Sequence, residues 1–184
     1  PAGARSWRRW RPSPAFPSFE IAPDILACAG GVSKVNAAMA AELLCLRYGV
    51  DLILTPAWPG ASRICPPGTL VVASEFVQHD VDDHRCGDPS AWVSTVNQVA
   101  FPTWQPECCA ELLASLGHPA VTGRVSTGDW FAVKGQRAEW IRGTFSPLLT
   151  EMEAVPSPRY ACGTVSVRIG EVRLRPPVSD SQAE

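Results

Sequence analysis

The pattern of hydrophobic and polar positions predicts a regular middle of the chain between two ends that have no period. Short apolar runs with the length of buried strands occur at 25–29, 51–54, 68–73 and 120–126. Between them, apolar residues at helical spacing predict helices over 35–48, 106–116 and 134–144. Residues 1–23 hold five prolines and neither period, so no element is predicted there.

Turn and cap residues mark the ends of the first predicted helix. Gly30 and Gly31 form the turn after the first strand, Ser33 is a candidate N-cap, and Gly49 is a candidate C-cap. The apolar positions near one face of this helix are Val35, Ala38, Met39, Leu43 and Leu46.

Strands that alternate with helices predict an α/β domain whose mixed or mostly parallel sheet is covered on both faces. With 46% apolar residues among 184, the chain can build one core of ordinary size. We interpret residues 25–154 as that domain, preceded by an unassigned segment, 1–24. The C-terminal segment, 155–184, lacks the apolar period and is expected to pack poorly, as is 1–20.

Charge and cysteine content narrow the class of protein. The formal net charge of -2 favours neither nucleic acid nor a membrane surface as a partner. Seven cysteines, an odd number without a Cys-x-x-Cys pair, fit a reduced cytoplasm better than a disulfide framework. Since no apolar stretch approaches the roughly 20 residues of a membrane helix, we expect a soluble cytoplasmic protein.

Four sequence motifs carry the candidate chemistry, and their order and spacing are more specific than any one of them. They are GVSKVNAAMAAELL (31–44), GTLVVASEFVQHDVD (68–82), GRVSTGDWFA (123–132) and TEMEA (150–154). Over residues 28–154 this arrangement resembles the bacterial 5'-methylthioadenosine/S-adenosylhomocysteine nucleosidases of the nucleoside phosphorylase superfamily. The resemblance implies a three-layer αβα fold with a mixed central sheet and a cytoplasmic homodimer. It also implies a purine nucleoside ligand, adenine release in methionine salvage, and no cofactor or metal.

An acidic residue in the last motif suits the chemistry of N-glycosidic bond cleavage. Positive, oxocarbenium-like charge develops on the ribose, so a carboxylate on the sugar hydroxyls both orients the sugar and stabilises that charge. Glu153 is the candidate, and the resemblance implies that Met152 and Glu153 together bind the ribose. The alternative is that Glu151 and Glu153 are surface acids at a strand end.

The resemblance also assigns the adenine contacts. It implies that Phe131 stacks on the base while the backbone of Phe131 and Ala132 hydrogen-bonds the purine edge. Trp130 stands where the family has smaller residues, and ordinary core packing is the alternative for Phe131.

The acidic and histidine-rich run that ends the second motif and continues two residues beyond it offers a metal-site interpretation. Such side chains at short spacing include borderline and hard ligands. We interpret the run as a loop without metal, because the matching run in the family binds none. Its members are His79, Asp80, Asp82, Asp83 and His84.

The chain departs from the family in three places, so no catalytic residue can be assigned. Residues 1–24 show no glutamate-rich turn to supply the base that activates water. A proline-rich stretch stands at 54–69 in place of the family's glycine loop, and 154–177 replaces the helix, strand and N7-protonating aspartate. Both later stretches permit the family's residues in a shifted reading frame, so we hypothesise small insertions and deletions, or a decayed gene.

Three functions are consistent with this pattern. The first is hydrolysis of 5'-methylthioadenosine or S-adenosylhomocysteine to adenine and a thio-sugar. The second is a futalosine hydrolase or purine nucleoside phosphorylase, and the third is a non-catalytic nucleoside-binding remnant.

Overall fold

A computed structural model describes residues 16–23, 25–50, 53–54, 65–66, 68–82, 84–130, 135–154, 162–163 and 165–167. Its strands are β1 (Ser18–Ala22), β2 (Ile25–Cys28), β3 (Ile53–Leu54), β4 (Leu70–Gln78), β5 (Ala100–Pro102), β6 (Ala120–Thr127), β7 (Leu149–Glu151), β8 (Cys162–Gly163) and β9 (Val165–Val167). Its helices are α1 (Lys34–Tyr48), α2 (Pro106–Ser115), α3 (Gln136–Phe145) and the short 3-10 turn η2 (His84–Cys86).

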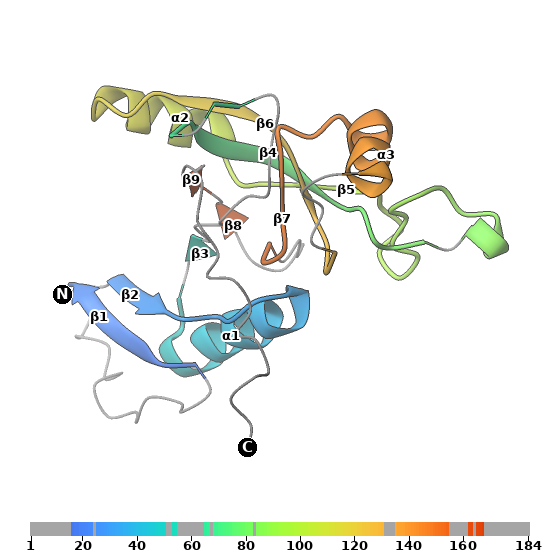
Figure 1. Cartoon of the computed structure of the whole chain (residues 1–184). Helices are drawn as coiled ribbons and strands as arrows, with labels where there is room; N and C mark the ends of the chain where they lie inside the picture. Colours follow the sequence, from blue (N-terminus) through green and yellow to red (C-terminus); the bar gives the residue numbers. More distant parts are fainter. Residues whose placement is uncertain are drawn as a thin grey trace, which may run out of the picture.

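A mixed five-stranded sheet, with α2 and α3 beside it, lies in the upper part of Figure 1. The order of its main path is β5-β4-β6-β7, and β9 also pairs with β4. Strands β4, β6 and β7 run parallel to one another, whereas β5 and β9 are antiparallel to β4. The predicted α/β fold is therefore confirmed.

The strand β4 is buried on both faces, and a bulge changes the phase of its side chains. Its pairing with β6 shifts register between Ala73 and Glu75. Because the bulge adds one residue, the side chains that face the first cluster have odd numbers before it and even numbers after it. Ala73 and Phe76 consequently share one hydrophobic cluster, while Val77 packs in a second cluster with residues of α3.

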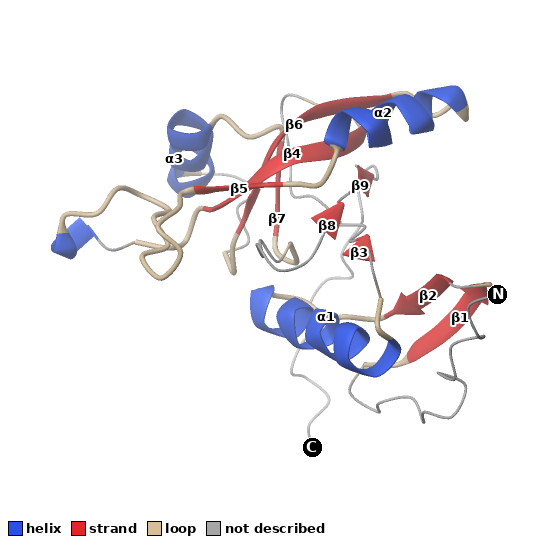
Figure 2. Ribbon diagram, turned by 180° about the vertical axis from the view of Figure 1, so that it is seen from behind, coloured by secondary structure: helices blue, strands red, loops and turns tan. Residues whose placement is uncertain are grey.

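Two smaller units complete the described structure. β1 and β2 form an antiparallel hairpin, and β3 pairs in parallel with β8. Figures 1 and 2 both place α1 beside this hairpin and away from α2, which packs against β4 and β6.

Most predicted elements of the middle region are confirmed, and their bounds shift by only a few residues. The helices predicted at 35–48, 106–116 and 134–144 correspond to α1, α2 and α3. Gly49 closes α1 in the left-handed conformation, with φ 61° and ψ 44°, as the C-cap prediction required.

Three details of the sequence interpretation are wrong or incomplete. The prediction of no element before residue 24 missed β1, although Phe19 and Ile21 alternate with polar residues there. Ser33 precedes α1 but makes no side-chain capping bond, because its backbone adopts φ 87°. The apolar face of α1 includes exposed positions rather than a buried stripe; these are Val35, Met39 and Leu46.

No helix in the described part of the chain is both long and apolar enough to cross a membrane.

The two stretches of the frame hypothesis, 54–69 and 154–177, fall mainly outside the described residues, so that hypothesis stays a prediction.

Candidate functional site

The carboxyl ends of three parallel strands bring the candidate residues to one edge of the sheet. β4 ends at Gln78 and leads into His79 and Asp80, β6 leads into Asp129, and β7 leads into Glu153. Ligands commonly bind at this edge of a parallel sheet. The topology therefore assembles a site from motifs that lie far apart in the sequence.

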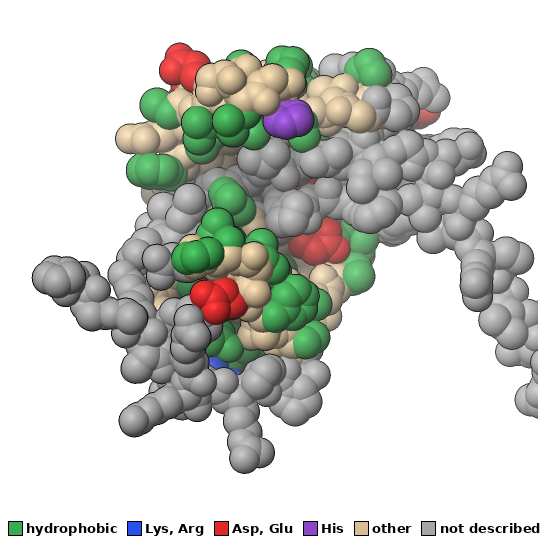
Figure 3. Space-filling model, turned by 90° about the vertical axis from the view of Figure 1, so that its left-hand side faces the viewer, with side chains coloured by type: hydrophobic (Ala, Val, Ile, Leu, Met, Phe, Trp, Pro, Cys, Tyr) green, Lys and Arg blue, Asp and Glu red, His purple; other side chains and the backbone are tan. Residues whose placement is uncertain are grey.

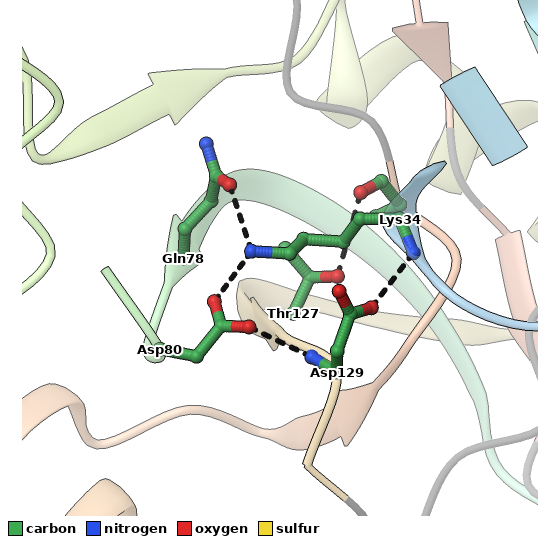
Figure 4. A network of polar contacts seen from close by, with 6 residues as sticks. Lys34, Gln78, Asp80, Thr127 and Asp129 are labelled. Atoms are coloured by element: carbon green, nitrogen blue, oxygen red, sulfur yellow. Dashed lines mark hydrogen bonds and ion pairs between the residues drawn. The ribbon is translucent and has the colours of Figure 1, made fainter. Parts of the chain in front are cut away.

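The amino end of α1 is tied to this edge by Lys34 (Figure 4). The Lys34 ammonium lies 2.6 Å from Asp80 Oδ1 and donates to Gln78 Oε1 at 3.2 Å. The Lys34 backbone N–H donates to Asp129 Oδ1 at 2.9 Å, and the Asp129 N–H donates to Asp80 Oδ2 at 2.8 Å. One lysine and two aspartates thus join three chain segments.

Asp80 is held in its ionised form at this junction. Burial raises the pKa of its carboxyl, but the Lys34 ammonium and the Asp129 N–H outweigh burial, so the net pKa lies below its usual value. A group with a lowered folded pKa adds stability above its unfolded pKa, and that stability is lost as the pH falls through the folded value.

Replacing Lys34 with Met is therefore expected to lower the free energy of unfolding by about 1–2 kcal/mol at pH 7, since Asp80 loses its cation. The loss should shrink as the pH falls through the lowered folded pKa of Asp80, where the carboxylate becomes protonated. Urea unfolding at pH 7 and at more acidic pH values measures it.

The matched control is Glu75→Gln, which removes the more exposed ion pair with Arg124, where the two side chains are 30% and 37% exposed. An exposed pair contributes less than about 1 kcal/mol. Equal losses for Lys34→Met and Glu75→Gln would contradict a special role for the Lys34 junction.

His79 is fully buried beside this network. Neither ring nitrogen has a hydrogen-bond partner among the described residues. Its ring centroid lies 5.9 Å from that of Trp130. The Trp130 ring also contacts the Arg137 guanidinium, which lies 4.4 Å from the Trp130 ring centroid. Burial lowers the pKa of His79, only partly opposed by Asp80, so the imidazole is neutral at pH 7.

Gly128 allows the segments after β4 and β6 to approach each other. A Cβ atom at this position would lie 2.5 Å from His79 Nε2 and 2.9 Å from Asp80 Cγ. Both side chains are fixed, the first by burial and the second by its ion pair. A methyl group cannot be accommodated without moving one of them.

Gly128→Ala is accordingly expected to destabilise the protein by about 1–2 kcal/mol through overpacking. Gly143→Ala is the control: its Cβ would meet no atom within 4 Å, and it lies inside α3. Because Ala favours helix, that control should stabilise by about 0.5–1 kcal/mol. Thermal unfolding of the two variants should give shifts of opposite sign; shifts of the same sign would refute the close contact.

Glu153 lies half-buried at the end of the turn that follows β7. Burial raises the pKa of its carboxyl, and so does the charge of Asp129, while N–H groups of Met152 and Ser33 favour the ionised form. The Met152 N–H lies 3.3 Å from Glu153 Oε2. Ser33 donates from a backbone with φ 87°, a conformation that costs energy for a non-glycine residue.

Glu151 is the most deeply buried acid of the site, with 2% of its surface exposed. Its Oε2 atom accepts the backbone N–H groups of Glu153 and Ala154, both at 2.6 Å. Burial raises its pKa to about 7, although Thr127 and the two N–H groups act in the opposite direction. The alternative of a surface acid is wrong for Glu151, because its side chain shares the inward face of β7 with Leu149.

The structure places Glu153 near Asp129 and the Ser33 backbone, at the border of the Lys34 network, but it does not describe the predicted adenine contacts. Phe131 and Ala132 lie outside the described residues, as does Asp83. Among the described residues, no group of three or more His, Cys, Asp or Glu side chains is arranged to hold a metal ion.

Sequence reasoning missed Lys34, Asp129 and the buried Glu151. Lys34 and Asp129 both lie inside motifs that the sequence singled out, yet their partners are distant along the chain. For Glu151, alternation with Leu149 was the available signal.

The fold and the site together define the class of protein. The model of the phosphorylase superfamily matches residues 19–173, which is most of the chain. The chain therefore belongs to the phosphorylase superfamily.

The curated relatives of this chain include bacterial nucleosidases. A 5'-methylthioadenosine/S-adenosylhomocysteine nucleosidase of Bacillus licheniformis is 30% identical over 147 residues, covering 74% of this chain and 61% of the relative. One from Geobacillus kaustophilus is 35% identical over 128 residues, covering 67% of this chain and 54% of the relative. The chain thus spans only about three fifths of the length of these relatives.

Solved structures show the same fold at lower identity. The nucleosidase of Neisseria meningitidis in complex with methylthio-immucillin-A gives a TM-score of 0.73 at 22% identity, covering 82% of this chain and 71% of that one. Futalosine hydrolase of Helicobacter pylori gives 0.74 at 20% identity, covering 83% and 70%.

Proposed function

We propose that this site binds a purine nucleoside and cleaves its N-glycosidic bond by hydrolysis. The substrates we propose are 5'-methylthioadenosine and S-adenosylhomocysteine, with adenine and a thio-sugar as products. The observation that carries the proposal is the Glu153 carboxylate at the carboxyl ends of β4, β6 and β7, with Met152 beside it. The names of the curated relatives support the choice of substrate.

The electrostatics of the site suit an oxocarbenium-like transition state. The Glu153 carboxylate is half-buried beside the exposed Asp129, and in such surroundings its negative charge acts more strongly than it would in water. A carboxylate placed on the ribose hydroxyls stabilises positive charge that develops on the sugar. We propose that Glu153 makes this contact and that Phe131 and Ala132 bind adenine.

Binding without turnover is the second candidate function. The base that activates water and the acid that protonates N7 have no recognisable residue in this sequence. The stretches that would carry the loop and the acid, 54–69 and 154–177, depart from the family in the sequence. A site that retains Glu153 but lacks these groups would hold a nucleoside without cleaving it.

One assay separates the candidates. The protein is incubated with 5'-methylthioadenosine in phosphate-free buffer, and free adenine is measured by chromatography. Adenine release supports the hydrolase, and release only after phosphate is added supports a phosphorylase. Saturable binding without release supports the binding function, and no binding at all would contradict all three. Futalosine as an alternative substrate tests the remaining candidate.

The frame hypothesis has a separate test in the gene. If the nucleotides of codons 55–65 spell the family's glycine loop in the shifted frame, a chain with both stretches restored should release adenine faster than this one. An unrelated shifted reading would show that 55–65 is a genuine, divergent loop.

We further propose a cytoplasmic homodimer. Large apolar side chains are exposed on the β1–β2 hairpin, on α1 and in the loop between them, and the hairpin side is visible in the lower half of Figure 3. Exposed apolar surface of this kind marks contact sites between proteins. The residues are Phe19, Ile21, Ile25, Val32, Val35, Met39 and Leu46.

A further inference from the structure

The turn that carries Glu153 is held by a buried side chain rather than by strand pairing alone. Glu151 Oε2 accepts the N–H groups of Glu153 and Ala154, each at 2.6 Å. One oxygen atom therefore fixes two successive peptide groups of the turn. Bonds of this length to a carboxylate are charge-assisted and among the stronger hydrogen bonds in proteins.

Glu151 is in turn fixed to the sheet. It pairs with Thr127 in the β6–β7 register, and its carbonyl oxygen accepts the Gly128 N–H at 3.3 Å. The Thr127 hydroxyl donates to the Ala154 carbonyl at 3.4 Å, and Ala154 is fully buried. The turn is thus clamped at its far end by β6 as well as by the Glu151 carboxylate.

We propose that Glu151 is a positioning residue for Glu153: through these two N–H groups it sets the direction in which the Glu153 carboxylate meets a ribose. The inference deepens the proposed function and rests on it, since Glu153 is there the ribose ligand. Glu151 itself need not touch the nucleoside.

The cost of a carboxyl group at this position supports a role that a hydrocarbon could not fill. The Thr127 side chain lies near this carboxyl, but its hydroxyl donates to the Ala154 carbonyl, so Oε1 has no hydrogen-bond partner among the described residues. Burial and the Glu153 charge both raise the pKa of Glu151. A leucine would avoid the burial of a polar group, but it offers no acceptor to the Glu153 and Ala154 N–H groups. What the acid supplies here is the acceptor.

Two substitutions separate the acceptor from the bulk of the side chain. Glu151→Gln keeps an oxygen that can accept both N–H groups, whereas Glu151→Leu has similar bulk and no acceptor. The probes are adenosine, which has the ribose hydroxyls, and adenine, which lacks the ribose. Dissociation constants for both are measured by calorimetry at pH 8, and thermal unfolding confirms that each variant is folded.

We expect Glu151→Leu to weaken adenosine about tenfold while changing adenine less than about twofold, because a misdirected carboxylate loses its contact with the sugar. Glu151→Gln should stay within about threefold of the wild-type protein for both ligands. Equal weakening of adenosine and adenine by Glu151→Leu would mean a general structural role and would overturn the proposal. So would a Gln variant as weak as the Leu variant.

Two additions keep the test decisive. If Glu151→Leu does not fold, Glu151→Asp retracts the carboxylate by one carbon–carbon bond, about 1.5 Å, and should show the same selective loss for adenosine. Glu153→Gln is measured in parallel. If it shows no selective loss, the proposed function fails; if it does and the Glu151 variants do not, only the positioning role fails.

Discussion

Glu151→Gln is expected to remove a pH-dependent contribution to stability of up to about 3 kcal/mol, the difference between a folded pKa of about 7 and the unfolded value. The folded protein binds this proton more tightly than the unfolded chain does. Between about pH 4.5 and 7 stability therefore falls as the pH rises, because a buried carboxyl must ionise. Glutamine has no proton to lose, so the variant should gain relative to the wild-type protein over that range.

Urea unfolding of both proteins at pH 4.5, 6 and 8 measures this difference directly. Subtracting the free energy of unfolding of the wild-type protein from that of the variant at each pH cancels the contribution of other titrating groups such as His79. Glu111→Gln, at an exposed position of α2, removes the same charge and should leave the wild-type pH dependence unchanged. Parallel curves for Glu151→Gln and the wild-type protein would show that the buried carboxyl does not titrate in this range.

The second large effect concerns ligand affinity. Glu153→Gln should weaken the binding of 5'-methylthioadenosine by about 1.5–3 kcal/mol, roughly 10- to 150-fold, while leaving that of adenine almost unchanged. The reason is that a charge-assisted hydrogen bond to the sugar is replaced by a neutral one. Stability should not fall, because the substitution removes repulsion between Glu153 and Asp129. Equal weakening of nucleoside and free base would move the sugar contact to another residue.

Hydrophobic period and turn residues predicted most of the elements around the site, and the reason is local. Helices α1, α2 and α3 have apolar spacing or cap residues that act within a few positions, as Gly49 does at the end of α1. Such signals need no knowledge of which strands are neighbours. The role of Glu153 came instead from the resemblance of the four motifs to the nucleosidase family, and it stays a prediction.

The contacts that shape the site depend on neighbours, and they could not be predicted. Lys34 and Asp80 are 46 positions apart, and only the parallel pairing of β4 and β6 brings Asp129 between them. The bulge after Ala73 changes which positions of β4 face each side of the sheet, and the hydrophobic pattern of the strand does not predict that change. Ser33 has the sequence position of an N-cap, but its side chain makes no capping bond, and its backbone N–H donates to the Glu153 carboxylate.

The close contact at Gly128 also depends on which segments are neighbours in the fold. A glycine after a strand is unremarkable in sequence, and its importance comes from His79 and Asp80 packing against it. The segments that complete the proposed site, including Phe131 and Ala132, lie outside the described residues, so their part in adenine binding stays a prediction.

A double cycle on the sugar contact tests whether Glu153 binds the ribose. The wild-type protein and Glu153→Gln are each titrated with adenosine and with 2',3'-dideoxyadenosine, which lacks both ribose hydroxyls. If Glu153 binds those hydroxyls, the two changes should be coupled by about 1.5–3 kcal/mol, because the charge of the carboxylate strengthens binding only when the hydroxyls are present. A coupling energy of zero, with both proteins discriminating equally between the two ligands, would contradict the account.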